Sequence, residues 1–366
     1  MANSKKKKNG ISSNAKLAIT LLCEIIVLLG MGVGYFFYYT NSKMEKIVYV
    51  ELKKEDLAIN EGANEAQKGF TTIALFGIDS RDMNSMMQGN RSDSIMIASI
   101  NNDTKEVKIA SVYRDSLFQV NDDGAVTTKV TNAYSYGGPE LAIQTLNANL
   151  DLQIEDFITV NFYALTLAID DLGGIEINVR EEELSVLNTC ITEQVALTGI
   201  YSDGVFTTGE QLLNGTQATA WARIRSTDMG DITRTERQRT VISKMVAKAK
   251  TAGLGTVDKV IDDVFPNIAT SLDKGELYDM VKNIFSYQFG DTAGFPFAYE
   301  FVNHDSKGAI IVAADMATNV SALHKFLFGT DNYTPTQSVQ NISDSIVNEI
   351  GVGQKEIDMN IFNPPD

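Results

Sequence analysis

The chain has 366 residues, enough for one large domain or two small ones, and its 44% apolar and 21% charged residues are typical of a globular protein. Its formal net charge of −16 argues against nucleic-acid binding as the main activity. Its two cysteines, Cys23 and Cys190, lie far apart and exclude a disulfide framework. The two histidines stand outside every motif, which gives little support to a histidine-based triad or a zinc site.

The N-terminus is predicted to anchor the protein in a lipid bilayer. Residues 1–16 form a basic tail, and residues 17–39 form an apolar run that, as a helix, spans about 34 Å and can cross a membrane. Because basic residues favour the cytoplasmic side, we expect a single-pass protein with a cytoplasmic N-terminus and an extracellular C-terminal domain. A cleaved signal peptide is the alternative. An extracellular domain without disulfides fits a Gram-positive bacterium.

Beyond the anchor, strands and helices alternate. This predicts an α/β (α+β-like) sandwich with a single mixed central β-sheet flanked by helices. Residues 40–69 are polar and are expected to form a juxtamembrane spacer. The predicted strands of the first half are 70–78, 94–100, 107–112, 158–162 and 175–179, of which the second and third should form a hairpin. The predicted helices are 137–150 and 163–172, and residues 181–208 are expected to be an insertion or a surface loop.

The second half begins with an arginine-rich segment that leads into a helix from residue 232. Further helices are predicted at 257–264, 277–289 and 320–328, and strands at 298–302 and 309–313. We therefore expect one domain over residues 70–329. Residues 330–366 are polar and contain three prolines, which predicts a flexible tail.

The arginine-rich segment, residues 221–239, contains five of the nine arginines of this acidic chain. Arg223 and Arg225 are two residues apart, so an extended backbone projects them from one face. Asp231 can cap the following helix, on which Arg234 and Gln238 share a face near the N-terminus. Guanidinium groups beside a helix N-terminus suit a phosphate or pyrophosphate. The alternative is a solvated helix face with surface ion pairs to nearby acidic residues.

Three more arginines, Arg81, Arg91 and Arg114, each lie within two residues of an aspartate at a predicted strand end, where α/β sheets bind ligands. Asp79 ends the first strand and Asp93 precedes the second. If these strands are neighbours, the two carboxylates can hold Mg²⁺ or Mn²⁺, with phosphate oxygens and water completing the coordination. The alternative is that the aspartates only form ion pairs with the arginines beside them.

The ordered motifs resemble those of the LytR-CpsA-Psr family. They are GIDSRD, NRSDSIMIASIN, YRDS, KVTNAYSYGG and DDLGGIEINV, followed by the arginine pair at 223 and 225 and by Asp231, Arg234 and Gln238. The resemblance covers about residues 70–250 and the anchor. It implies an extracytoplasmic α/β enzyme that moves a glycopolymer, such as teichoic acid or capsular polysaccharide, from undecaprenyl diphosphate to peptidoglycan.

The resemblance also implies roles for individual residues. Asp79 and Asp93 match metal-binding aspartates, and Asp231 matches an acidic residue beside the arginines. The positions that match pyrophosphate contacts are Arg91, Arg114, Arg223, Arg225, Arg234 and Gln238. Arg114 and Asp231 are the expected catalytic residues, with Asp231 or Asp115 as candidate base.

A hydrophobic lipid channel is implied as well. Six apolar residues could line such a channel or could be ordinary core, namely Leu141, Ile143, Leu146, Leu165, Leu167 and Ile169.

Two other functions stay open from the sequence. One is a non-catalytic sensor that binds the lipid diphosphate, and the other is a hydrolase in which water replaces the sugar acceptor. A transcriptional regulator is disfavoured, because the predicted extracellular part is acidic and has no helix-turn-helix pattern.

Overall fold

The structure, a computed structural model, describes residues 42–79, 89–121, 125–225 and 230–352. The chain divides into two units, Met1–Lys46 and Ile47–Asp366. In the described end of the first unit, the N–H of Lys46 donates to the carbonyl of Lys43 (3.2 Å). No helix within the described ranges is long and apolar enough to cross a membrane, and the predicted basic tail and transmembrane helix, residues 1–39, lie outside them.

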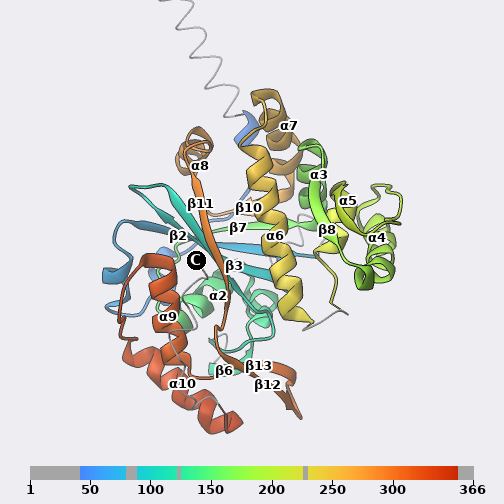
Figure 1. The fold of residues 1–366 in the computed structure, drawn as a ribbon. Coiled ribbons are helices and arrows are strands. Elements are labelled where there is room, and N and C mark those ends of the chain that lie inside the picture. Colours follow the sequence, from blue (N-terminus) through green and yellow to red (C-terminus); the bar gives the residue numbers. More distant parts are fainter. Residues whose placement is uncertain (1–41, 80–88, 122–124, 226–229, 353–366) are drawn as a thin grey trace, which may run out of the picture. The chain divides into compact units, whose positions relative to one another are not determined.

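A seven-stranded mixed sheet forms the centre of the second unit (Figure 1). In spatial order its strands are β1 (Val48–Tyr49), β10 (Ile268–Thr270), β7 (Asp156–Asn161), β2 (Phe70–Ile78), β3 (Ser92–Asn101), β4 (Glu106–Val112) and β11 (Gln288–Phe295). β3 is antiparallel to both β2 and β4, whereas β7 runs parallel to β2 and β11 runs parallel to β4. The predicted mixed sheet and the hairpin between the second and third predicted strands are confirmed.

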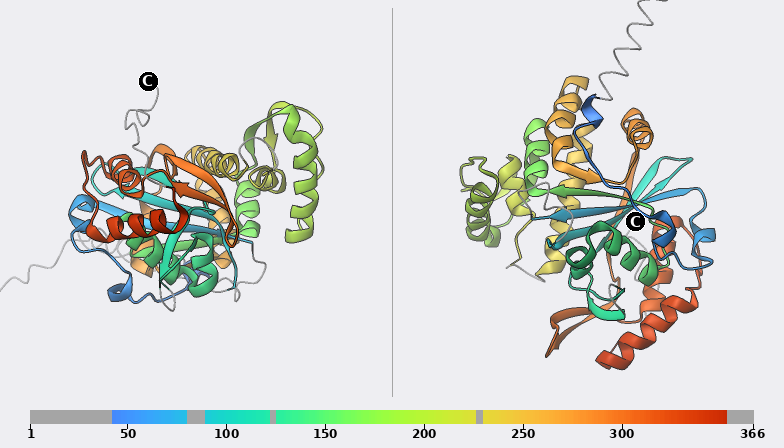
Figure 2. Two further views of the ribbon diagram at one scale, coloured as in Figure 1. Left: turned by 90° about the horizontal axis from the view of Figure 1, so that it is seen from below. Right: turned by 180° about the vertical axis from the view of Figure 1, so that it is seen from behind.

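Helices cover both faces of this sheet, as Figures 1 and 2 show. The helices are α2 (Thr131–Leu150), α3 (Phe162–Asp171), α4 (Leu184–Thr198), α5 (Gly215–Trp221), α6 (Asp231–Ala249), α7 (Leu254–Val264), α8 (Lys274–Lys282), α9 (Met316–Phe328) and α10 (Gln337–Ile350). Phe76 of β2 belongs to the core beneath α2, α9 and α10, whereas Leu75 lines a pocket beneath α3 and α6. Successive side chains of a strand point to opposite faces, so β2 is packed on both.

Three two-stranded sheets accompany the central one within the described residues. They are β5 (Leu117–Asn121) with β6 (Ala125–Lys129), β8 (Ile175–Val179) with β9 (Gly209–Leu213), and β12 (Tyr299–His304) with β13 (Gly308–Ala313). All three pairs are antiparallel. The predicted strands 175–179, 298–302 and 309–313 therefore exist, but they lie in these small sheets and the fold has more than a single sheet.

Several predicted elements differ from the structure. Residues 181–208 contain the helix α4, whose Leu187 and Ile191 are buried, and are not simply a surface loop. The helix predicted at 277–289 ends at Lys282, and β11 follows it as an edge strand. α2 begins at Thr131, before the predicted start at Gly137, and is kinked at Gly137 and Gly138 because Gly138 adopts a positive φ of 66°.

The two segments predicted to be a spacer and a tail are part of the fold, so both predictions are wrong for their described residues. In residues 47–69, Leu57 is 1% exposed and packs in the main core. The C-terminal segment forms α10, whose Val339, Ile342 and Ile346 are buried in the same core. Short 3₁₀ turns complete the chain at Lys54–Asp56, Ala63–Gln67, Glu181–Glu183 and Phe265–Asn267.

One residue, Asp151, attaches both of these segments to the domain. It follows α2 in the left-handed region (φ 52°) and is fully buried. Its carboxylate accepts from Asn60 Nδ2 (2.6 Å), from Thr336 N and Oγ1 (both 2.7 Å) and from the Tyr333 hydroxyl (3.2 Å). These contacts span 91 to 185 residues of sequence, so a local polar composition could not predict them.

Candidate active site

Four chain segments meet at one end of the central sheet. Because β2 and β3 are antiparallel neighbours, Asp79, just after β2, and Asp93, at the start of β3, lie at the same edge. β4 returns to this edge, and Arg114 follows it after one residue. The segment between α5 and α6 and the first turns of α6 bring the remaining arginines.

Asp93 is the centre of the arginine cluster. Its Oδ1 pairs with Nη1 of Arg114 at 2.5 Å, and its Oδ2 pairs with Nη2 of Arg225 at 3.0 Å. Its backbone carbonyl accepts from Nη2 of Arg234 at 2.9 Å. Burial alone would raise the pKa of Asp93, but the three guanidinium charges outweigh burial and lower it below 3.8. Asp93 is therefore ionised at neutral pH.

Arg234 is the most deeply buried member of the cluster, with 2% of its side chain exposed. Its Nη2 lies 2.5 Å from Oδ1 of Asp231, whereas Nε and Nη1 have no hydrogen-bond partner among the described residues. Burial, together with the neighbouring Arg225 and Arg114, lowers the pKa of Arg234 to about 10, so it stays charged at neutral pH. A buried cation with unbonded N–H groups can donate to the oxygens of an anion.

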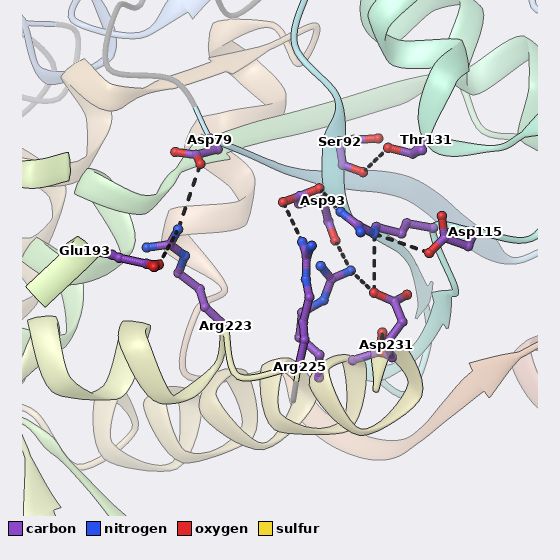
Figure 3. A network of polar contacts seen from close by, with 12 residues as sticks. Asp79, Ser92, Asp93, Asp115, Thr131, Glu193, Arg223, Arg225 and Asp231 are labelled. Carbon is purple, nitrogen blue, oxygen red and sulfur yellow. Dashed lines mark hydrogen bonds and ion pairs between the residues drawn. The ribbon is translucent and has the colours of Figure 1, made fainter. Parts of the chain in front are cut away.

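Beside this cluster, Arg223 points toward Asp79 and Glu193, while Arg225 points toward Asp93 (Figure 3). Arg223 also donates to Oε1 of Gln194 (3.0 Å) and stacks 5.0 Å above the ring of Phe162. Together these segments form what we call the arginine pocket, lined by Asp79, Asp93, Phe162, Val186, Thr189, Cys190, Glu193, Arg223, Arg225, Arg234 and Gln238.

Asp231 does not cap α6, which corrects that prediction. Gly230 occupies the N-cap position, and Asp231 is the first helical residue. Its Oδ1 pairs with Nη2 of Arg234 and, at 3.3 Å, with Nε of Arg114. Burial raises the pKa of Asp231 above 3.8 despite these two cations. Asp231 is not among the residues that line the arginine pocket, and its contacts orient the two arginines from behind.

Arg237, from the same arginine-rich segment, has a structural role. Its Nη2 and Nε donate to Oε1 of Glu183 at 2.8 and 3.1 Å, and both side chains are at most 3% exposed. The indole N–H of Trp221 donates to Oε2 of the same carboxylate (3.0 Å). This buried pair joins α6 to the start of α4. No pattern in the sequence distinguishes the role of Arg237 from that of Arg225.

The charged side chains that line the arginine pocket balance one another. Three arginines face three carboxylates, those of Asp79, Asp93 and Glu193. Both oxygens of Asp93 are engaged by arginines, whereas Asp79 is 43% exposed and its one ion pair with a described residue is to Arg223, at 4.0 Å. Within the described residues no group of three or more acidic, histidine or cysteine side chains could hold a metal ion. Two carboxylates fit Mg²⁺ when phosphate oxygens and water supply the other ligands.

An apolar pocket adjoins the arginine pocket and shares Phe162 and Gln238 with it. Its floor is the face of β2, β3 and β7 that carries Leu75 and Met96, and its roof is α6, which contributes half-buried Ile242, Met245 and Val246. Small residues make room there: Gly77 pairs with Ser94 across β2 and β3, and a Cβ at Gly77 would lie 2.9 Å from that of Ser94.

Of the six apolar residues predicted either to line a channel or to be core, only Leu165 lines this pocket. Leu141, Ile143 and Leu146 are buried in the main core on the opposite face, and Ile169 is buried in the cluster formed with α4 and α5.

The structure brings most of the predicted site residues together. Asp79, Asp93, Arg223, Arg225, Arg234 and Gln238 line the arginine pocket. Arg114 and Arg91 line a separate polar pocket on the far side of the Arg114–Asp93 pair. Arg81 lies outside the described residues. The pocket wall formed by α4, with Cys190 and Glu193, was not predicted, because residues 181–208 resemble an insertion in the sequence.

The fold and the site define an α/β domain that can bind an anionic head group beside an apolar chain. The model of the LytR_cpsA_psr family matches residues 33–294, and the chain belongs to that family. The resemblance noted in the sequence is thereby confirmed.

Two Bacillus proteins illustrate the relationship. Polyisoprenyl-teichoic acid--peptidoglycan teichoic acid transferase TagV of Bacillus subtilis (strain 168) is 26% identical over 261 residues, which are 70% of this chain and 63% of TagV. TagU of Bacillus cereus (strain AH820), named as the same kind of transferase, is 28% identical over 70% of this chain and 79% of its own length. The chain thus spans less than two thirds of TagV.

Solved structures agree in fold. The crystal structure of B. subtilis TagV has a TM-score of 0.55 and 26% identity, covering 73% of this chain and 99% of TagV. A Streptococcus agalactiae protein has a TM-score of 0.62 at 22% identity, covering 76% of this chain and 94% of its own.

Proposed function

We propose that this protein is a membrane-anchored phosphotransferase that moves a glycopolymer from a polyprenyl-diphosphate lipid carrier to peptidoglycan. The observation that carries the proposal is the contact between the arginine pocket and the apolar pocket, which share Phe162 and Gln238. A ligand that fills both needs a doubly charged head and a long apolar tail, and a prenyl diphosphate has this chemistry. The names of the Bacillus relatives specify a polyisoprenyl-linked donor and peptidoglycan as acceptor.

In this proposal a hydroxyl of the acceptor glycan attacks the sugar-side phosphorus of the diphosphate. A new P–O bond forms, the bond from that phosphorus to the bridging oxygen breaks, and the lipid phosphate leaves with the bridging oxygen. Arg225 and Arg234 donate to the leaving phosphate, and Arg114 balances charge near the attacked phosphorus. The hydroxyl proton passes to a carboxylate, for which Asp231 and Asp115 are the candidates.

Asp231 acts in this scheme mainly as a positioning residue, because its carboxylate already pairs with Arg234 and Arg114. Asp115 is the better candidate for the base. It lines the polar pocket beside Arg114 and is 22% exposed, whereas Asp231 is 14% exposed.

We further propose that Asp79 and Asp93 hold Mg²⁺ (or Mn²⁺) together with the diphosphate. The charges that line the arginine pocket sum to zero, so a dianionic diphosphate would leave an uncompensated negative charge there. Bound Mg²⁺ would neutralise that charge and polarise the phosphoryl oxygens. The aspartates would keep Arg223 and Arg225 aimed at the same oxygens.

The cellular setting of the proposal comes from the sequence. We propose that residues 17–39 span the membrane, that the domain lies outside the cell, and that undecaprenyl diphosphate carries the polymer, either teichoic acid or capsular polysaccharide. The apolar pocket would then take the first isoprene units of a lipid whose remainder lies in the bilayer.

The proposal is tested with the purified full-length chain, a synthetic polyprenyl-diphosphate oligosaccharide, peptidoglycan fragments and Mg²⁺, with products identified by mass spectrometry. A glycan joined to the acceptor through a phosphodiester is the expected product. Release of phosphorylated sugar without an acceptor product would instead identify a hydrolase. Lipid binding without turnover in Mg²⁺ or Mn²⁺ would identify a sensor.

Chelation should abolish transfer. We expect activity to fall by at least about 10²-fold in excess EDTA and to return when Mg²⁺ is added, because the diphosphate charge is otherwise unbalanced. Asp79→Asn should raise the Mg²⁺ concentration needed for half-maximal rate, whereas Glu182→Gln, an exposed acidic residue outside the pocket, should not. Full activity of the wild type in EDTA would exclude the metal.

The apolar pocket should govern affinity for the lipid tail. We expect Met245→Gln to weaken binding of a prenyl diphosphate about tenfold, because half-buried apolar area worth about 1.5 kcal/mol is lost. Lys244→Gln, one residue away on the exposed face of α6, is the matched control. The loss should grow with the length of the prenyl chain, and equal affinities of both variants for all chain lengths would contradict this site.

A further inference from the structure

A second polar pocket lies directly beside Arg114, on the other side of its ion pair with Asp93. Asp93 lines the arginine pocket and Arg114 lines this second one, and their 2.5 Å contact separates the two. The second pocket has a volume of about 480 Å³, within the usual range of ligand sites. We call it the hairpin pocket, because the turn of the β12–β13 hairpin forms one wall, opposite β6 and the start of α2.

The hairpin wall belongs to this chain's C-terminal part and lies beyond residue 294, where the family match ends. It contributes Lys307, whose Nζ donates to the carbonyl of Thr127 (2.6 Å) and pairs with Glu349 of α10 (2.7 Å). With 16% of its side chain exposed, Lys307 is held in one position at the pocket wall. The hairpin thus supplies a cation, held in place by Glu349 of α10, that lies outside the residues matched by the family model.

The side chains that line the hairpin pocket include more cations than carboxylates. Its lining contains four cations, Arg91, Arg114, Lys129 and Lys307, and a single carboxylate, that of Asp115. Lys129 and Arg114 both pair with this carboxylate, at 2.9 and 3.6 Å. Arg91 is exposed and has no ion-pair partner among the described residues. Lys307 and Arg114 are also paired with Glu349 and Asp93, which do not line the pocket, so Arg91 is the lining cation that is left to meet an anionic ligand.

The neutral groups of the pocket suit a sugar. Nδ2 of Asn132 donates to the hydroxyl of Thr128 (2.8 Å), and both side chains line the pocket. Tyr136 also lines the pocket and is 49% exposed, a large fraction for an aromatic residue. Hydroxyl and amide groups can exchange hydrogen bonds with a polyol, and an aromatic ring can cover its apolar face.

We propose that the hairpin pocket binds an acidic carbohydrate, a sugar that carries a carboxylate or a phosphate, next to the reacting phosphorus. This inference rests on the proposed function. If the lipid tail fills the apolar pocket and the diphosphate fills the arginine pocket, the sugar side of the reaction needs a polar site at the remaining end, beyond Asp93 and Arg114. Lys307 and Arg91 pair with the acid group, and Asn132 and Thr128 bond the sugar hydroxyls.

The acid group has two possible sources, which share this chemistry. It belongs either to the acceptor glycan, as a carboxylate of peptidoglycan, or to the polymer on the donor, as a phosphate of its repeat. Steady-state transfer by the full-length chain separates them. Each substrate is supplied in an acidic form and in a neutral form, the acceptor with its carboxyl groups amidated and the donor with a head group that has no phosphate repeat.

Lys307→Gln keeps a donor for the Thr127 carbonyl and removes the charge, and Lys325→Gln, an exposed lysine of α9, is the matched control. We expect Lys307→Gln to raise KM for the acidic form of one substrate about tenfold, with kcat within about twofold, and to leave KM for its neutral form unchanged. The substrate that responds identifies the source. Equal KM values for variant and wild type on all four substrates would overturn the proposal.

A binding measurement keeps this inference separate from the proposed function. Calorimetry with an acidic peptidoglycan tetrasaccharide and with a short polyglycerol phosphate requires no turnover. We expect wild-type protein to bind one of them, and Lys307→Gln and Arg91→Ala to bind it at least about fivefold more weakly. Arg91 is exposed and unpaired within the described residues, so its replacement should leave the fold intact. If neither compound binds the wild type, the hairpin pocket is not a carbohydrate site, whether or not transfer occurs.

Discussion

Replacement of Arg225 by alanine is expected to lower the rate of transfer about 10³-fold. Arg225 is 44% exposed in the arginine pocket, where its Nη2 reaches Asp93 and its remaining N–H groups can meet the diphosphate. In enzymes that transfer phosphoryl groups, loss of one guanidinium at the site lowers the rate by roughly 10³-fold to 10⁵-fold. The fold should survive, since Asp93 keeps its pair with Arg114 and an exposed pair contributes less than about 1 kcal/mol.

Two further variants make this prediction specific. Arg225→Lys keeps the charge but loses the planar fork, so it should recover only part of the rate. Lys325→Ala on α9 removes an exposed cation far from the pocket and should retain full activity. Single-turnover rates, with circular dichroism as the check on folding, decide the matter. Activity of Arg225→Ala within about threefold of wild type would remove Arg225 from the clamp.

Replacement of Glu183 by glutamine is expected to lower the free energy of unfolding by about 3–5 kcal/mol, because it leaves the buried guanidinium of Arg237 without a counter-charge. The neighbouring Glu182→Gln is the control: Glu182 is 54% exposed, and its loss should change stability by less than about 0.5 kcal/mol. Urea denaturation of the two variants gives the comparison. A loss below about 1 kcal/mol for Glu183→Gln would mean that the buried pair does not hold α6 in place.

The carboxylate of Glu183 should also make the free energy of unfolding depend on pH. Burial alone would raise the pKa of Glu183, but hydrogen bonds from the backbone of Arg180 and from Trp221 and Arg237 lower it below its usual 4.5. As pH falls, Glu183 is therefore protonated in the unfolded chain before it is protonated in the folded protein. Its contribution to stability is complete above about pH 4.5 and is lost as pH falls through the lower pKa of the folded state. The stability difference between wild type and Glu183→Gln should shrink between pH 5 and pH 3. A constant difference would contradict the pKa shift.

Much of the central sheet could be predicted from sequence alone. β2, β3 and β4 are largely apolar runs, and the hairpin pairing of β3 with β4 follows from their short connection. The predictions that were wrong concern segments whose structure depends on distant partners. α10 and residues 47–69 look polar along the sequence, yet both dock on Asp151 through bonds to Asn60 and Thr336. Local patterns contain no information about such contacts.

The sequence by itself determined the chemistry of the site. The clustering of arginines in an acidic chain, and the aspartates beside strand ends, already pointed to a charged phosphate ligand. Only the tertiary structure decided which of those arginines line the arginine pocket. Arg225 and Arg237 look alike in sequence, but Glu183 neutralises Arg237 in the interior, while Arg225 stays half-exposed in the arginine pocket. Burial and pairing depend on which segments meet in space. The position of Lys307 depends on this as well, because the C-terminal hairpin brings it to the hairpin pocket.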